Sequence, residues 1–222
     1  MRIVIFGAGG RAGRAAVAEA EARGHEVTAV VRDPARHREL GAARVVAGDV
    51  SVAADVARLA TGHHAAINAA ADLAAPADVF FPGAASALDA GLGAAGVPRL
   101  LFVGLASVLP GASGVPLMDE PGYPNEYRPF MLGHAAGLER LRGSALDWVY
   151  AAPAGDFDHG AGRTGTYRIA EHADRNDLIS YADLAVALLD EVEHPRHHRS
   201  PLTIGGAAPA DETADGAANG SA

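Results

Sequence analysis

Neither cysteine nor lysine occurs among the 222 residues of this chain. The absence of cysteine excludes disulfides, thiolate metal sites and cysteine nucleophiles. The absence of lysine means that all 18 basic Lys and Arg positions are arginine, and these arginines form only short clusters. Together with a net charge of −9, this argues against a nucleic-acid partner, because neutralising phosphates requires basic side chains gathered on one face.

Long apolar runs are also absent. No uninterrupted apolar stretch approaches the ~20 residues that a membrane helix needs. The first apolar stretch, at residues 2–6, leads straight into glycines rather than into a signal-peptide cleavage site. We therefore expect a soluble, cytoplasmic protein with no membrane partner. With 49% hydrophobic and 20% charged residues, the composition is typical of a globular chain, and its length predicts one domain.

Segments typical of strands alternate with segments typical of helices, which is the pattern of a parallel sheet covered on both faces. The expected strands are residues 2–6, 26–31, 44–47, 65–69, 99–103 and 147–151, and the expected helices are residues 11–23, 52–60, 77–95 and 129–142. We predict an α/β fold with a Rossmann-type, doubly wound parallel sheet. Its ligands should lie beyond the carboxyl ends of the strands.

The pattern changes after residue 153. The elements expected there are a glycine-rich loop at residues 155–165, called the C-terminal loop below, a strand at 166–169, a helix at 181–193 and a strand at 202–204. We interpret them as a small substrate-binding region of the same domain, which then spans residues 1–206. Residues 207–222 lack large apolar side chains and should form a disordered tail.

The most informative motif is Gly7-Ala8-Gly9-Gly10-Arg11-Ala12-Gly13, called the glycine motif below. It lies between the first expected strand and the first expected helix. There, glycines allow close approach of a pyrophosphate, and the helix supplies free N–H groups and the positive end of its dipole. We expect Gly7, Gly9, Gly10, Arg11, Ala12 and Gly13 to contact a dinucleotide. The alternative is an ordinary glycine turn.

The end of the second strand predicts which dinucleotide binds. An NAD site usually places a carboxylate there for the ribose hydroxyls, but this chain has Arg32. A guanidinium suits a 2′-phosphate, and Arg11 adds a second cation, so NADP(H) is favoured over NAD. Asp33 could pair with Arg32 or contact the ribose. Arg32 could also be an ordinary exposed arginine at a strand end.

Two further strand ends predict contacts with the adenosine. Asp49 and Val50 follow the third strand, where a carboxylate can accept a hydrogen bond from the adenine amino group, although a turn or cap aspartate is an equal alternative. The small residues Asn68, Ala69 and Ala70 follow the fourth strand and let the ribose lie close to the backbone. A plain buried strand end would also favour alanine.

These residues make the chain resemble the atypical short-chain dehydrogenase/reductase group of NAD(P)H-binding proteins. That group includes NmrA-like proteins, flavin reductases similar to biliverdin reductase B, and candidate NADH-flavin reductases of bacteria. The stretches that carry the resemblance are residues 5–13, 31–34, 48–50, 95–104, 146–150, 163–167 and 179–185. The resemblance implies an NAD(P)-dependent oxidoreductase whose substrate and nicotinamide meet near residues 104–110 and 152–158. Gly104 and Pro153 would then contact the cofactor.

The chain also departs from this group. Related sequences carry Gly-Gly-Ala-Gly-Ser-Leu after the fifth strand, whereas here the run reads Gly104-Leu105-Ala106-Ser107-Val108-Leu109, so the serine is displaced by one position. The wider superfamily uses a tyrosine acid with a lysine four residues later. Here Tyr127 follows Tyr123 at that spacing, Met131 follows Tyr127, and no lysine exists anywhere. The Ser-Tyr-Lys mechanism is therefore not expected.

Other residues must then supply any proton. The catalytic candidates are Ser107, Tyr123 and Tyr127, each with packing, capping or surface exposure as the alternative. The expected substrate-binding residues lie in loops at 104–130 and 152–180, which carry specificity at the top of the sheet. They are Leu105, Val108, His134, Asp156 and Phe157.

No metal site is predicted. His197 is adjacent to His198 and His63 to His64, and no carboxylate motif accompanies either segment, so we interpret residues 194–198 and 63–64 as solvated loops. A hydrolase is unsupported because no Gly-x-Ser-x-Gly motif occurs.

Three functions remain open. The first is an NADPH-dependent reductase of a small aromatic or conjugated substrate, such as a flavin, a quinone or a polyketide-like ketone of bacterial secondary metabolism. The second is a non-redox isomerase, cyclase or dehydratase on the same fold. The third is an NmrA-like redox sensor that binds NADP. We expect a monomer or homodimer.

Overall fold

Eight strands form the central sheet of the computed structural model, which describes residues 1–41 and 44–207. In order across the sheet they are β3 (Arg44–Ala47), β2 (Glu26–Val31), β1 (Arg2–Phe6), β4 (Ala65–Asn68), β5 (Arg99–Val103), β6 (Asp147–Pro153), β10 (Ser200–Gly206) and β8 (Tyr167–Ile169). Neighbours run parallel, except that β8 is antiparallel to β10. The predicted α/β, doubly wound sheet is confirmed, with the order reversing between β1 and β4.

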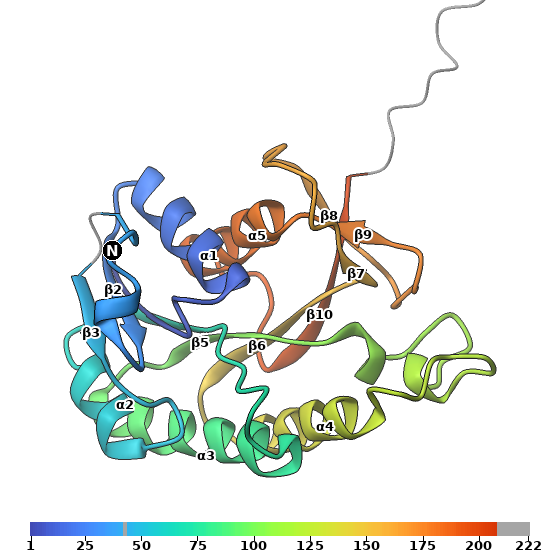
Figure 1. Ribbon diagram of the computed structural model, residues 1–222, viewed down its shortest axis with the longest axis horizontal. Coiled ribbons are helices and arrows are strands. Elements are labelled where there is room, and N and C mark those ends of the chain that lie inside the picture. The colour runs from blue at the N-terminus through green and yellow to red at the C-terminus, as the bar shows by residue number, and fades with distance from the viewer. Residues whose placement is uncertain (42–43, 208–222) are drawn as a thin grey trace, which may run out of the picture.

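Helices cover both faces of the sheet, as Figure 1 shows. One layer contains α1 (Arg11–Ala22) and α5 (Tyr181–Glu193), and the other contains α2 (Ala53–Ala60), α3 (Ala77–Ala95) and α4 (Arg128–Arg142). Because side chains alternate along a strand, Val4 and Phe6 of β1 face the second layer, while Ile3 and Ile5 face the first. This double burial explains why β1 is apolar throughout. In the ranges described, no helix is long and apolar enough to cross a membrane.

The predicted elements match the observed ones with ends that differ by at most one or two residues. The largest differences are at β6 and β10, which extend beyond their predicted ends because they pair in parallel from Val149 opposite Ser200 to Pro153 opposite Ile204. The predicted tail begins at residue 207, and residues 208–222 lie outside the described part of the chain.

Several short elements were not predicted. β7 (Asp156–Phe157) and β9 (Leu178–Ile179) form a second, two-stranded parallel sheet. Three short 3-10 helices follow strand ends or loops: η1 (Pro34–Arg36), η2 (Ala106–Val108) and η3 (Leu117–Asp119). All five lie in connections near the carboxyl ends of the strands, where sequence periodicity is too short to reveal them.

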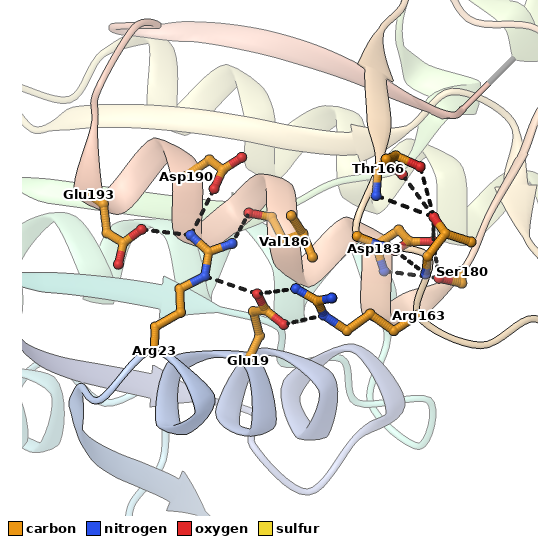
Figure 2. Close-up of polar contacts among 11 residues, drawn as sticks. Glu19, Arg23, Arg163, Thr166, Ser180, Asp183, Val186, Asp190 and Glu193 are labelled. Atoms are coloured by element: carbon orange, nitrogen blue, oxygen red, sulfur yellow. Dashed lines mark hydrogen bonds and ion pairs between the residues drawn. The ribbon is translucent and has the colours of Figure 1, made fainter.

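A buried carboxylate joins α1 to α5 and to the C-terminal loop (Figure 2). Glu19 of α1 is 6% exposed. It accepts hydrogen bonds from Nε of Arg23 at 2.9 Å and from Nε of Arg163 at 2.8 Å. Arg23 also donates to Asp190 at 2.7 Å and to Glu193 at 2.6 Å, both on α5. Glu19 therefore holds two guanidinium groups, one within the helical layer and one at the end of the loop.

The C-terminal loop is also fixed to the start of α5. Asp183, buried in the first turn of that helix, accepts hydrogen bonds from the backbone N–H of Thr164 at 2.9 Å and of Gly165 at 2.8 Å. Its carboxylate also accepts from the hydroxyls of Thr164 and Ser180, each at 2.9 Å. The loop thus ends in a closed set of charge-assisted hydrogen bonds.

Replacing Glu19 with glutamine should lower the free energy of unfolding by about 1–3 kcal/mol at pH 7, because it weakens the charge-assisted hydrogen bonds from two arginines. Hydrogen bonding from Arg163, with Arg23 contributing, lowers the pKa of Glu19. A lowered carboxyl pKa stabilises the fold above the ordinary glutamate value of about 4.3, and that contribution is lost as pH falls through the folded-state pKa.

Urea unfolding at a series of pH values tests this, with Glu139→Gln as the control because Glu139 makes an exposed pair with Arg142 on α4. The difference between wild type and the Glu19 variant should shrink on acidification. A difference that is absent at pH 7, or unchanged in acid, would contradict the assignment.

Candidate functional site

The glycine motif turns tightly between β1 and α1. Gly7 has a φ of +74°, a conformation that residues with a Cβ rarely adopt. A Cβ on Gly7 would lie 2.4 Å from the backbone of Ala70, and a Cβ on Gly13 would lie 2.1 Å from the carbonyl oxygen of Gly7. The backbone of the first turn of α1 therefore packs directly against the backbone of Gly7, with no side chain between them.

The amino end of α1 can receive an anion. Gly10 is its N-cap and supplies no side-chain hydrogen bond, and the first turn contains no acidic residue. The N–H of Arg14 donates to the carbonyl of Gly10 at 2.8 Å, so the N–H groups of residues 11–13 precede the helical hydrogen bonds. These residues fit the pyrophosphate of a dinucleotide.

A side chain that the sequence did not single out, His37, covers the glycine motif. A Cβ on Gly9 would lie 2.5 Å from its imidazole. Arg14 contacts both His37 and Gly9. Its Nη2 lies 3.3 Å from Nδ1 of His37, and its Nε donates to the carbonyl of Gly9 at 2.8 Å. His37 follows η1 in an irregular segment, so only the three-dimensional contact reveals it.

Arg32, the predicted ligand of a 2′-phosphate, lies just after β2. Its Nη1 donates to Asp72 at 2.5 Å, and its side chain is 68% exposed. Asp72 follows β4, so this ion pair connects the two strands that flank β1. The backbone N–H of Ala74, and then Arg32, hold the pKa of Asp72 below its ordinary value. Asp33 does not pair with Arg32 but accepts from the N–H of Ala35 at 3.0 Å and caps η1.

The other predicted adenosine contacts lie around the same strand ends. Asp49 accepts from the backbone N–H of Ser51 at 2.9 Å and from its hydroxyl at 2.7 Å, which is the turn geometry considered as an alternative. Val50 is buried in the core. Asn68 is 1% exposed and accepts from the N–H of Ala70 at 3.3 Å. Of the residues at these strand ends, Ala69 and Ala70 lie against Gly7, and the contacts of all of them with an adenosine remain predictions.

A buried tyrosine supports the backbone after β5. A Cβ on Gly104 would lie 2.2 Å from the ring of Tyr150. The hydroxyl of Tyr150 accepts the N–H of Leu105 at 3.1 Å and lies 3.1 Å from Nδ1 of His134. Burial raises the pKa of Tyr150, so this hydroxyl stays protonated. Tyr150 was expected only as a strand residue.

His134, an expected substrate-binding residue, is a buried side chain, and its contact with a substrate remains a prediction. His134 is 6% exposed on α4, and its ring centroid lies 3.7 Å from that of Phe81. Burial lowers its pKa to about 3, so the imidazole is neutral and acts as the hydrogen-bond partner of Tyr150. Val108, another expected substrate residue, is also buried in the core, whereas Leu105 is half-buried beside it.

Two of the three catalytic candidates lie together. Ser107, in η2, is 2% exposed, and among the residues described its Oγ has no hydrogen-bond partner. Tyr123 is half-buried, and burial raises the pKa of its phenol while the nearby Ser107 hydroxyl opposes that rise. The two hydroxyls are therefore neighbours without forming a well-aligned hydrogen bond. Tyr127 does not join them, since it is 65% exposed at the N-cap of α4.

The C-terminal loop forms the opposite wall. Phe157 stacks on Tyr181 with ring centroids 3.9 Å apart. Asp156 accepts the backbone N–H of Phe157 at 2.7 Å, and its charge acts on Tyr123. Nη1 of Arg11, at the start of α1, lies 3.2 Å from Nδ1 of His159. Pro153 is buried at the end of β6. The loop thus runs from the Ser107 and Tyr123 pair to the amino end of α1.

Two cavities lie elsewhere. One of about 600 Å³ is lined by Arg2, Glu26, Thr28 and His63 at the amino ends of β1 and β2. Another of about 310 Å³ lies between Leu109 and Thr203. Neither contains the glycine motif or Ser107, and we place the candidate site with those residues because parallel sheets bind ligands at the carboxyl ends of their strands.

Both histidine segments lie in irregular, mostly exposed connections, as predicted, and several of their side chains also make ion pairs or hydrogen bonds. His197 contacts buried Glu191 at 2.6 Å, and His198 contacts Asp147 at 2.9 Å. His63 lies 2.9 Å from the hydroxyl of Thr28. Over the described ranges, no three histidine or acidic side chains are grouped to hold a metal ion.

The fold and the site define a Rossmann-type protein that binds a nicotinamide dinucleotide, and comparison with known families agrees. Residues 7–195 match the model of a family described as NAD(P)H-binding. The chain therefore belongs to the NAD(P)H-binding family, as its resemblance to atypical short-chain dehydrogenases and reductases predicted. Membership implies a small-molecule ligand.

Three relatives resemble the chain over nearly their full lengths. It is 37% identical to the uncharacterized protein YwnB of Bacillus subtilis, covering 92% of this chain and 98% of that one. A candidate epimerase from Bacteroides thetaiotaomicron has 34% identity and a TM-score of 0.81, covering 94% and 98%. A candidate NADH-flavin reductase from Streptococcus pneumoniae has 31% identity and a TM-score of 0.81, covering 93% and 100%.

Replacing Arg32 with alanine should weaken binding of NADP⁺ by about tenfold or more and leave NAD⁺ nearly unchanged, because a charge-assisted contact contributes roughly 1.5–3 kcal/mol. Titration calorimetry with both dinucleotides measures this. Arg142→Ala is the matched control, since Arg142 is an exposed arginine with one acidic partner on α4. An equal loss for both dinucleotides would refute the 2′-phosphate assignment.

Proposed function

We propose that this protein is an NADPH-dependent reductase of a small aromatic or conjugated substrate. The observation that carries the proposal is the buried Ser107 hydroxyl, which has no partner among the described residues and neighbours Tyr123 at the end of β5. A buried hydroxyl without a hydrogen bond is costly, and a substrate oxygen or nitrogen would satisfy it. The similarity to a candidate NADH-flavin reductase supports the same reaction class.

The residues of the glycine motif would bind the pyrophosphate, and Arg32 with Arg11 would select the 2′-phosphate. The backbone of Gly104 and Leu105, held by Tyr150, would border the nicotinamide. When bound, the nicotinamide supplies a hydride. The protein would orient the substrate and donate a hydrogen bond to it.

Ser107 would donate a hydrogen bond to the substrate oxygen or nitrogen that gains negative charge, and solvent would supply the proton after hydride transfer. Tyr123 keeps its proton because burial raises its pKa, and without lysine in the chain no ammonium strengthens it as an acid. Weak acid assistance suits a conjugated acceptor, since the negative charge that follows hydride addition is delocalised over the acceptor itself. This favours flavins, quinones and conjugated ketones over simple ketones.

The second candidate is a non-redox reaction, favoured by the similarity to a candidate epimerase. An enzyme of that kind shows no net oxidation of NADPH. Incubating the protein with NADPH and a panel of flavins, quinones and ketones, while following the nicotinamide absorbance, separates the two. We expect turnover with at least one conjugated acceptor. Tight NADP⁺ binding without oxidation of NADPH by any acceptor would overturn the reductase proposal.

Replacing Ser107 with alanine should lower kcat by about 10²-fold, the lower range for loss of one hydrogen-bond donor to the charge that develops in the transition state, with little change in the KM for NADPH. Tyr123→Phe should have a smaller effect because it keeps the ring. Tyr127→Phe is the control, since that side chain is exposed. Steady-state kinetics measure all three, and full activity of the Ser107 variant would remove Ser107 from the mechanism.

A further inference from the structure

Arg175, which belongs to none of the sequence motifs, lies over the ring of Tyr123 in the candidate site. The guanidinium carbon of Arg175 is 5.5 Å from the ring centroid of Tyr123, within the range of a cation–π contact. Its Nη1 donates to the carbonyl of Gly122 at 3.2 Å. Arg175 is exposed in the connection between β8 and β9, so its cation borders both the site and the solvent.

The backbone that carries Arg175 is fixed on both sides. The N–H of Ala173 donates to the carbonyl of Pro110 at 2.9 Å, and the N–H of Asp174 donates to the carbonyl of Ala154 at 2.8 Å. A Cβ on Gly155 would lie 2.3 Å from the carbonyl oxygen of Asp174. The segment therefore bridges the chain after β5 and the chain after β6, and it presents Arg175 between them.

The charges around Tyr123 come from two groups. Arg175 favours a negative charge there, and Asp156 opposes it. The Asp156 carboxylate accepts the N–H of Phe157 at 2.7 Å, which satisfies part of its own charge. A guanidinium has five N–H donors, and the Nη1 hydrogen bond to the Gly122 carbonyl uses one of those of Arg175, so others are available to a carboxylate. Ser107, the buried hydroxyl beside Tyr123, adds a donor at the same place.

We propose that Arg175 and Tyr123 form a recognition site for the carboxylate of a planar aromatic acid, so that the substrate of this site is anionic. The inference rests on the proposed reductase function, because it names the substrate class of that site. Arg175 binds the carboxylate through its N–H edge and Tyr123 packs against the substrate ring. Arg175 is a specificity-determining residue in this arrangement.

Titration calorimetry of the NADP⁺-saturated protein with 2-naphthoate and 2-naphthamide tests it, since the two compounds share a ring and differ in charge. Wild type should bind 2-naphthoate at least about tenfold more tightly, which corresponds to about 1.4 kcal/mol. Arg175→Ala should abolish that preference while leaving 2-naphthamide unchanged. Arg175→Lys should keep part of it, and Asp156→Asn should increase it.

Arg140→Ala is the matched control because Arg140 is an exposed arginine on α4, and it should keep the wild-type preference. Equal affinity of the two compounds in wild type, binding of neither, or an equal loss of both in Arg175→Ala would overturn the inference. The titration needs no turnover. A preference for 2-naphthoate without oxidation of NADPH by any acceptor would therefore reject the reductase proposal while leaving the anion site standing.

Discussion

The buried carboxylate of Glu19 connects the two walls of the candidate site, which are the amino end of α1 and the C-terminal loop. It lies on α1, whose amino end carries the glycine motif, and it binds Arg163 at the end of the C-terminal loop. Arg23 extends the same network to α5. The distance between the pyrophosphate cradle and the wall formed by Asp156 and its neighbours is thus set by a short chain of ionic hydrogen bonds rather than by loop packing alone.

Two buried hydroxyl groups, of Tyr150 and Ser107, lie on the other side of the site and differ in their hydrogen bonding. Tyr150 is fully buried and uses its hydroxyl to fix the N–H of Leu105, with neutral His134 as the second partner. Ser107 lies two residues further along the chain, and its hydroxyl keeps its hydrogen-bonding capacity for another group. The Tyr150 hydroxyl thus holds the backbone, whereas the Ser107 hydroxyl is available to the substrate of the proposed reaction.

The sequence predicted the strands, the helices and the NAD(P)H-binding family because their signals are local: apolar runs and glycines between a strand and a helix. It did not predict the features made by residues distant in the chain. His37 over Gly9, Tyr150 behind Gly104 and Arg175 over Tyr123 each depend on how separate loops meet. The surroundings of His134 were not predicted for the same reason, since a histidine on α4 gives no local sign that it contacts Phe81 and Tyr150.

The contact between Gly7 and the backbone of Ala70 has a consequence for affinity. Because the cradle at α1 consists of main-chain N–H groups held by backbone contacts, a pyrophosphate immobilises no rotatable side chain when it binds there, and little conformational entropy is lost. Arg32 differs, since it is an exposed side chain paired with Asp72. In the proposed NADP(H) site, the part common to all dinucleotides would therefore be preorganised, whereas Arg32, proposed to distinguish them, would lose side-chain freedom on binding.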